Sequence, residues 1–239
     1  MIAIFKRELK AYFVTPLGYV FIGVYLIFSG AFFYLFTLMS STPTLGSADF
    51  ATMFSLMFFV LMVTVPLLTM RLFSEEKKNK TDQLTLTAPV SLFGIVSAKF
   101  AAAYSIFLIS TAAMPIYGIV LSQFTDVSWR SMLGNMVGLI MLGAVYTSAG
   151  LFVSSLTENQ MVAAIVSVFV NISFLLSSIA ASYVGVGFIA DALRGLSLLS
   201  RYDRFTVGLF ELTNILFFIS VVFIFIFLTV RILEKRRWS

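Results

Sequence analysis

The sequence predicts an all-α, polytopic membrane protein with six transmembrane helices, and three observations support that fold class. First, 60% of the 239 residues are hydrophobic and only 11% are charged, whereas soluble globular domains carry about 25% charged residues. Second, six stretches without a charged residue are long enough to cross a bilayer, which takes about 20 helical residues. Third, the charged residues gather between these stretches, as they must if the stretches lie in lipid.

Residues 1–15 form the first predicted element, an amphipathic helix. Its apolar face consists of Ile2, Phe5, Leu9, Tyr12 and Phe13, and its basic face of Lys6, Arg7 and Lys10. We expect this helix to lie in the membrane interface with the basic side chains toward anionic headgroups.

The six spans follow in order, each enclosed by charged residues. The first, roughly Leu17–Met39, opens at Pro16 and Gly18 within 38 uncharged residues. The other five lie between Asp49 and Arg71 (21 residues), Lys99 and Asp126 (26), Arg130 and Glu158 (27), Glu158 and Asp191 (32), and Glu211 and Arg231 (19). We expect Pro66 to kink the second span and Pro115 the third, because proline has no N–H to donate.

The segment 71–91, RLFSEEKKNKTDQLTLTAPVS, separates the second and third spans and carries a cluster of charged residues. Asn79 and Lys80 are predicted to end one helix, and Thr81 can cap a short second helix that stops before Pro89. Ser91 can cap the third span in the same way.

The predicted short helix, about Thr81–Ala88, has two different faces. Asp82 and Leu86 share one face, and Leu84 and Ala88 share the roughly opposite one. One face can rest on the membrane while the other is presented to a partner.

Six spans place both chain ends on the same side of the membrane. That side carries twelve Lys and Arg, three in the N-terminal segment, five in the 71–99 region and four in the tail. The opposite loops carry four, namely Arg130, Arg194, Arg201 and Arg204. Because basic residues concentrate in cytoplasmic loops, both termini are predicted to be cytoplasmic.

The outer segment 185–210 is too charged to cross the membrane and too apolar for an ordinary loop. We expect a pair of short re-entrant helices there. Within and just after it, an outer gate is predicted, with a carboxylate of Asp191, Asp203 or Glu211 holding the arginines. Its residues are Arg201, Tyr202, Asp203, Arg204, Phe205 and Glu211. The alternative is a solvated loop.

Several classes of function are disfavoured by what the sequence lacks. It has no cysteine and no histidine, and the predicted spans hold no ionisable residue of the kinds that ion-coupled carriers and intramembrane proteases need. It has no G-x-x-x-x-G-K-[ST] phosphate loop, so ATP cannot be bound by that route. No catalytic, metal or cofactor site is predicted in this chain.

Two further features of the spans concern packing. Gly134, Gly138, Gly143 and Gly150 favour close helix contacts within the subunit, with a dimer contact as the alternative. Asn171 is expected to hydrogen-bond to a neighbouring helix.

Residues 70–91, MRLFSEEKKNKTDQLTLTAPVS, resemble the loop after the second membrane helix in the second class of ABC exporter permeases, the ABC-2 type. The pattern there is an Arg, an aromatic, acidic residues, a basic pair, Gly-Thr-Leu/Ile-Glu, a hydrophobic run and Pro-Val-Ser. This chain departs from it at Lys80, where Gly is usual, and at Gln83, where Glu is usual. FKRELKAYFVTPLGY and SRYDRFTVGLFEL also fit, so the resemblance covers nearly the whole chain. The gliding-motility-associated permease is the most similar type, and the copper-processing nitrous-oxide-reductase type is a relative.

The resemblance implies one permease domain over residues 1–239, with an interfacial helix (1–15), a cytoplasmic coupling loop (74–90) and an outer re-entrant segment (185–210). It further implies an exporter subunit of the bacterial cytoplasmic (inner) membrane that forms its pathway with a second permease chain, identical or related. A separate ATPase subunit would bind ATP and Mg, and an accessory membrane subunit is possible. No nucleic-acid partner is expected.

The resemblance also assigns residues to the contact with the ATPase: Glu75, Glu76, Lys77, Lys78, Thr81, Asp82 and Leu86. The competing interpretation is a solvated charge run that only fixes the topology. At the level of the whole protein, the alternatives are a non-transporting membrane scaffold or anchor and an ATP-independent channel. The sequence does not identify the substrate.

Overall fold

The computed structural model describes residues 1–39, 50–81, 90–124, 126–184, 195, 197–206 and 211–237. These residues form helices and contain no strand, which confirms the predicted all-α class. The elements are α1 (Ile2–Val14), α2 (Pro16–Phe32), the π-helical η1 (Phe33–Leu38), α3 (Ala51–Thr69), α4 (Arg71–Lys78), α6 (Leu92–Thr111), α7 (Met114–Leu121), α8 (Trp129–Leu156), α9 (Gln160–Val184), α11 (Leu198–Thr206) and α12 (Leu212–Arg237).

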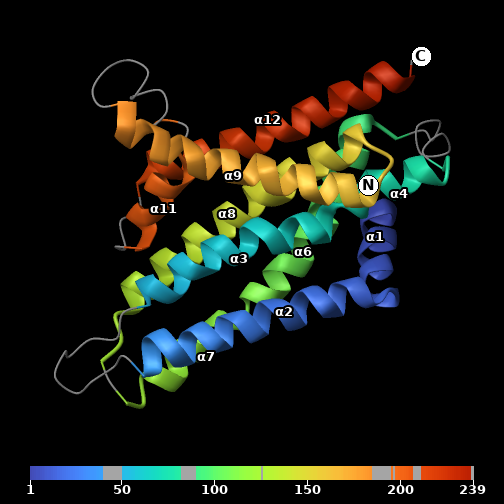
Figure 1. Ribbon diagram of the computed structural model, residues 1–239. Helices are drawn as coiled ribbons and strands as arrows, with labels where there is room; N and C mark the ends of the chain where they lie inside the picture. Colours follow the sequence, from blue (N-terminus) through green and yellow to red (C-terminus); the bar gives the residue numbers. More distant parts are fainter. Residues whose placement is uncertain are drawn as a thin grey trace.

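Six helical segments among the described residues are long and apolar enough to cross a membrane, as predicted. They are α2 with η1, α3 with α4, α6 with α7, α8, the first 18 residues of α9, and α12. The axes of the spans have similar orientations. Both chain ends lie at the same end of the bundle, which we call the terminal end (Figure 1).

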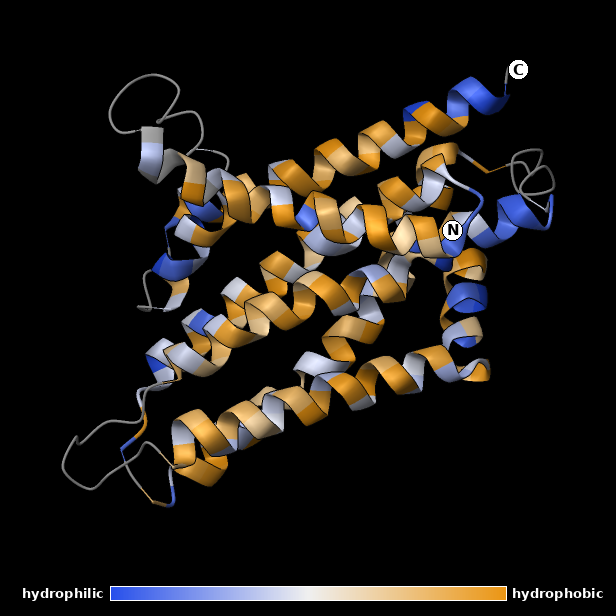
Figure 2. Cartoon of the chain, viewed as in Figure 1, coloured by the Kyte–Doolittle hydropathy of each residue, from blue (hydrophilic) through white to orange (hydrophobic). Residues whose placement is uncertain are grey.

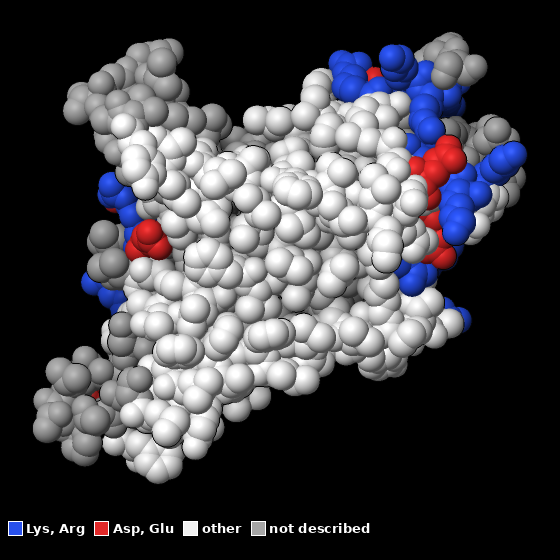
Figure 3. Space-filling view, viewed as in Figure 1, with Lys and Arg blue, Asp and Glu red and all other residues white. Residues whose placement is uncertain are grey.

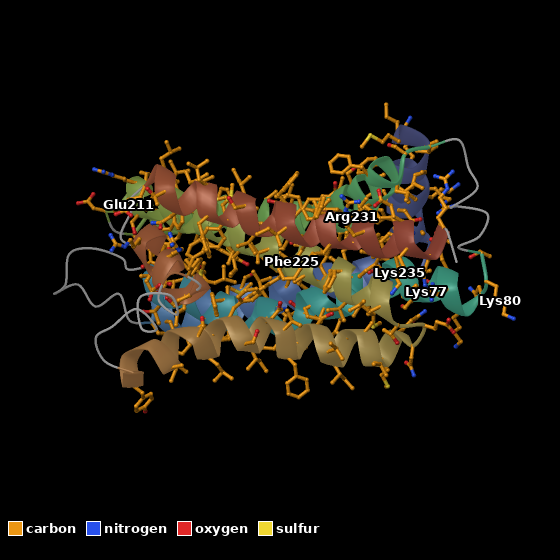
Figure 4. The ribbon with its side chains drawn as sticks, turned by 90° about the horizontal axis from the view of Figure 1, so that it is seen from above. Lys77, Lys80, Glu211, Phe225, Arg231 and Lys235 are labelled. Carbon is orange, nitrogen blue, oxygen red and sulfur yellow. The ribbon has the colours of Figure 1, made fainter. Side chains whose placement is uncertain are left out.

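Apolar residues cover the middle of the molecule, and hydrophilic ones gather at its two ends (Figure 2). In the space-filling view a wide uncharged belt separates a strongly basic terminal end from a smaller charged group at the opposite end (Figure 3). The view from above places Lys77, Lys80 and Lys235 at one end, Glu211 at the other, and Phe225 between them (Figure 4). This distribution is the one that a bilayer requires.

Helix α1 runs across the terminal end of the bundle rather than along it (Figure 1). The turn into α2 is tight, because a Cβ on Gly18 would lie 2.6 Å from the carbonyl oxygen of Tyr12. Pro16 sits in the first turn of α2, where its missing N–H has no helical partner to lose. Helix α1 packs against α6 and α2, and Tyr12 is buried there with its hydroxyl donating to the Leu68 carbonyl at 2.9 Å.

Helix α8 is the most buried of the six spans and packs against α3, α6, α9, α11 and α12. Its small residues make these contacts possible. A side chain at Gly138 would collide with Phe205, one at Gly143 with Phe107, and one at Gly150 with Thr69. These glycines therefore serve close packing within the subunit, which is the first of the two interpretations above.

Pro66 lies inside α3 and leaves the Met62 carbonyl without its usual helical donor. The side-chain amide of Asn171 on α9 donates to this oxygen at 3.1 Å. The predicted hydrogen bond from Asn171 to a neighbouring helix is thus confirmed, and it replaces the bond that the proline removes.

Pro115 interrupts the third span instead of kinking a continuous helix. Helix α6 ends at Thr111, and α7 restarts at Met114 with the proline in its first turn. A proline in a first turn loses no intrahelical bond, so a restart is favourable there. Ser91 caps α6 as predicted, accepting a hydrogen bond from the Gly94 N–H at 3.2 Å.

Candidate functional site

The junction between α3 and α4 is the centre of the candidate site at the terminal end. The helical chain breaks for one residue at Met70 and continues as α4. Ser154 of α8 joins the two parts, because its hydroxyl donates to the Met70 carbonyl at 3.0 Å and accepts from the Phe73 and Ser74 N–H groups at 3.0 and 3.2 Å. The start of α4 is therefore fixed to α8 through a single side chain.

Lys99 forms a second connection at this junction. Although it ends the charged 71–99 region of the sequence, it lies within α6 and is 1% exposed. Its ammonium contacts the Leu72 carbonyl at 2.7 Å, the Glu76 carboxylate at 2.9 Å and the Glu8 carboxylate at 3.2 Å. Three acceptors match the three N–H groups of an ammonium. The buried charge is thus compensated, as it must be in such an environment.

Arg7 and Glu8 of α1 complete this charged group, which we call the junction cluster (Arg7, Glu8, Glu76 and Lys99). One guanidinium nitrogen of Arg7 lies 2.7 Å from the Glu8 carboxylate and 2.8 Å from that of Glu76. Burial opposes the ionisation of Glu8, but Lys99 and Arg7 together outweigh it and lower the pKa of Glu8. The hydrogen bond to Glu8 raises the pKa of Arg7. The cluster joins α1, α4 and α6 through formally balanced charges.

The four charged residues predicted to meet an ATPase lie in different surroundings. Glu75 is partly exposed and pairs with Arg71 at 2.9 Å, while Glu76 belongs to the junction cluster. Lys78 is exposed, but Lys77 is buried and its ammonium donates to the Ser155 carbonyl of α8. Helix α4 therefore turns Lys77 toward α8 rather than toward solvent, and the contact of these residues with an ATPase stays a prediction.

Helix α4 ends as predicted at Asn79 and Lys80. Lys80 adopts the left-handed backbone conformation, with φ 56°, which glycine adopts without strain. This is the position where the resembled family usually has Gly. The Thr81 N–H donates to the Glu76 carbonyl at 2.9 Å. Asp82, Leu86 and the predicted short helix lie outside the described residues.

A polar cleft of about 450 Å³ opens between α1, α4 and α6. The junction cluster forms one wall, and Arg71, Glu75, Asn79 and Thr81 contribute to the rest. The cleft thus lies beside the start of the predicted coupling helix. Among the described residues, no group of three acidic side chains is arranged to hold a metal ion.

At the opposite end, α11 is packed into the bundle. Leu198, Tyr202 and Phe205 share one face of the helix and are fully buried. The Tyr202 hydroxyl donates to the Phe54 carbonyl of α3 at 2.9 Å, and the Thr206 carbonyl accepts from Asn135 and Ser131 of α8. Burial raises the pKa of Tyr202 and of Asp203. A second re-entrant helix in 185–197 falls mainly outside the described residues.

The two arginines of α11 are held by α12 in different ways. Arg204 pairs with Glu211 at 2.8 Å, as one of the predicted carboxylate pairings requires. Arg201 instead donates to Asn214 at 3.1 Å and to the Gly195 carbonyl, and its guanidinium lies 4.0 Å from the centre of the Phe217 ring. Within the described residues its polar partners are therefore neutral, and Asp191, one of the predicted carboxylate partners, lies outside the described residues. Glu211 is connected to Arg201 through Asn214, whose side-chain amide donates a hydrogen bond to the Glu211 carboxylate at 3.0 Å.

Sequence reasoning missed Glu8, Ser154 and Asn214. Glu8 was obscured by the basic residues around it, although it is the only acidic residue in α1. Ser154 and Asn214 look like ordinary polar residues of a span and a helix start. The available signal was that a polar group in a membrane helix needs a partner.

Comparison with known protein families shows that residues 9–174 match the family described as ABC-2 family transporter protein. The match covers about two thirds of the chain. It includes α2 to α8 and most of α9, and therefore the α3–α4 junction, whereas α11 and α12 lie beyond it. No curated protein matches the chain.

Proposed function

The chain belongs to the ABC-2 transporter family, and from this membership we propose that it is the permease subunit of an ATP-driven exporter. It is a multi-pass membrane protein and a permease component of an ABC transporter. We further propose that a separate ATPase subunit binds ATP and Mg, that transport is outward, and that both termini lie in the cytoplasm. The gliding-motility-associated type is the subtype we propose.

The ATPase is proposed to contact the tip of α4 and the segment 82–89 that follows. The observation that carries this proposal is the connection of α4 to three other helices. Ser154 and the Lys77 contact join it to α8, and the junction cluster joins it to α1 and α6. A displacement of α4 by a partner is therefore transmitted to the spans, because these contacts are short, charged or buried.

Two permease chains are proposed to form the pathway between them, with α11 acting at its outer end. Support for the gate comes from the contacts of α11 with α3, α8 and Glu211, which precedes α12, so a movement of α11 would disturb all three contacts. An accessory membrane subunit remains part of the proposal.

Co-purification and ATP hydrolysis test the coupling. The tagged chain is isolated in mild detergent, and the protein bound to it is identified and reconstituted with it in nanodiscs. We expect a phosphate-loop ATPase whose hydrolysis rate rises in the presence of the permease. Leu86→Asp should abolish that stimulation, because the new charge would be buried unpaired in the complex. Phe124→Asp, at an exposed apolar residue of the opposite end, is the control.

If no ATPase co-purifies, the scaffold and channel alternatives gain support, and ion flux through the purified chain then separates the two. Normal stimulation in the Leu86→Asp protein refutes the docking role of the segment.

The gate is tested by Arg201→Ala, which removes the contacts to Asn214, Gly195 and Phe217 together. We expect a changed ATPase or transport rate at unchanged protein yield. Arg204→Ala is the matched control. The Arg204–Glu211 ion pair is exposed, so it contributes only about 0–1 kcal/mol to stability. If Arg201→Ala, Arg204→Ala and the unaltered protein all have the same ATPase and transport rates, the proposal that α11 acts as a gate is wrong.

A further inference from the structure

Helices α2 and α9 flank α3 on either side (Figure 1). Two adjoining hollows lie at the terminal end, one on each side of α3. The first, between α3 and α9, has a volume of about 610 Å³, and the second, between α2 and α3, has about 230 Å³. Leu67 and Met70 line both. A ligand that enters one hollow can therefore reach the other across these two side chains.

The α2–α3 hollow is almost wholly apolar. Leu17, Val20, Phe21 and Val24 form its α2 wall. The one polar side chain on its α3 wall, Thr64, donates its hydroxyl proton to the Val60 carbonyl at 2.9 Å, so this donor is already used within α3. Such a lining fits a hydrocarbon chain.

The α3–α9 hollow is amphipathic. Leu67, Met70, Met161 and Ala164 form an apolar side, and Lys78, Glu158, Asn159 and Gln160 form a polar side. Among the described residues nothing bonds to the Lys78 ammonium, whereas Lys77 next to it contacts the Ser155 carbonyl. Glu158 lies 3.9 Å from Arg236, which offsets its negative charge at the rim.

We propose that these two hollows together bind an anionic phospholipid from the leaflet on the side of the chain termini. Its phosphate lies against Lys78 with the amides of Asn159 and Gln160, and an acyl chain passes over Leu67 and Met70 into the α2–α3 hollow. The polar side lies at the end of α4, where a headgroup resides, and the apolar hollow lies along the spans. The order of polar and apolar surface thus matches that of a lipid.

Lipid retention on the purified full-length chain, without any ATPase, tests the proposal. Native mass spectrometry counts phosphatidylglycerol and phosphatidylcholine of equal chain length that remain bound. We expect a preference for phosphatidylglycerol of about fivefold, the size that one basic residue near a membrane surface provides. Lys78→Gln should remove this preference, while Lys80→Gln, at an exposed lysine outside both hollows, should keep it.

The acyl chain is tested separately. Leu67→Trp fills the shared wall and should lower retention of both lipids, whereas Val63→Trp, equally exposed at 48% one turn away and outside both hollows, should not. Soluble glycerol 1-phosphate should fail to compete.

Three results overturn the proposal. One is that Lys80→Gln loses the preference for phosphatidylglycerol to the same extent as Lys78→Gln, which would indicate general charge attraction. Another is an unchanged preference in Lys78→Gln. The third is competition by glycerol 1-phosphate, which indicates a free-anion site. Lys78 and Lys80 are both exposed, so neither variant puts folding at risk.

Discussion

Lys99 is a charged residue in a place where charge is tolerated only with full compensation. Removing its ammonium leaves the Glu8 and Glu76 carboxylates next to each other with one cation fewer. We therefore expect Lys99→Met to destabilise the protein by about 3–5 kcal/mol, measured as a lower thermal unfolding midpoint in detergent. Lys6→Met, at an exposed lysine of α1, should change stability by no more than about 0.5 kcal/mol. Similar midpoints for the two variants would contradict the account of the junction cluster.

Glu8 makes the stability of the same cluster depend on pH. Its pKa is lower in the folded protein than its ordinary value of 4.5, so the unfolded chain takes up a proton first as the pH falls. The stabilisation is fully present above pH 4.5 and is lost as the pH falls through the folded-state pKa. We expect Glu8→Gln to reduce the acid-dependent drop in the unfolding midpoint between about pH 5 and about pH 3, the range that lies around and below the ordinary pKa. If the unfolding midpoint of Glu8→Gln depends on pH in the same way as that of the unaltered protein, Glu8 is not the cause of the pH dependence.

At the scale of the helix, Pro66 and Asn171 act as a pair. Asn171→Leu leaves the Met62 carbonyl unpaired in the interior and should cost about 1–3 kcal/mol. In a Pro66→Ala background the new N–H can donate to that carbonyl, so the same Asn171→Leu change should cost less. Thermal unfolding of the four proteins of this double-mutant cycle gives the coupling, which should reach at least about 0.5 kcal/mol. Additive effects would show that the two residues are independent.

The helices also show where sequence reasoning ends. Each span could be predicted because crossing a bilayer is a local requirement, met within about 20 consecutive residues. The prediction of the candidate site was less complete because its contacts join distant segments. Glu8 and Lys99 are 91 residues apart, and Asn171 and Met62 are 109 apart. The pattern around Asn171 indicated that a partner was needed, but only the packing of α9 on α3 identifies Met62. Likewise, the burial of Lys77 and Lys99 follows from how α4 and α6 turn toward their neighbours.

At the scale of the whole molecule, the charge asymmetry predicts one orientation. The chain has no native cysteine, so single-cysteine variants report accessibility without background. Lys78→Cys and Glu158→Cys, at the terminal end, should be shielded from an impermeant reagent added outside intact cells, whereas Asp126→Cys and Gly46→Cys should react. Labelling of position 78 from outside would show that the terminal end does not face the cytoplasm, and the predicted orientation would be wrong.

The crosswise helix α1 also bears on how the protein is made. Its charged partners are Glu76 and Lys99, and Arg7 precedes Glu76 by 69 residues. A ribosome adding about 5–20 residues per second needs roughly 5–20 s to pass from Glu8 to Lys99. During that interval the contact of Glu8 with Lys99 cannot form. The junction cluster can therefore be completed only after Lys99 in α6 has been synthesised.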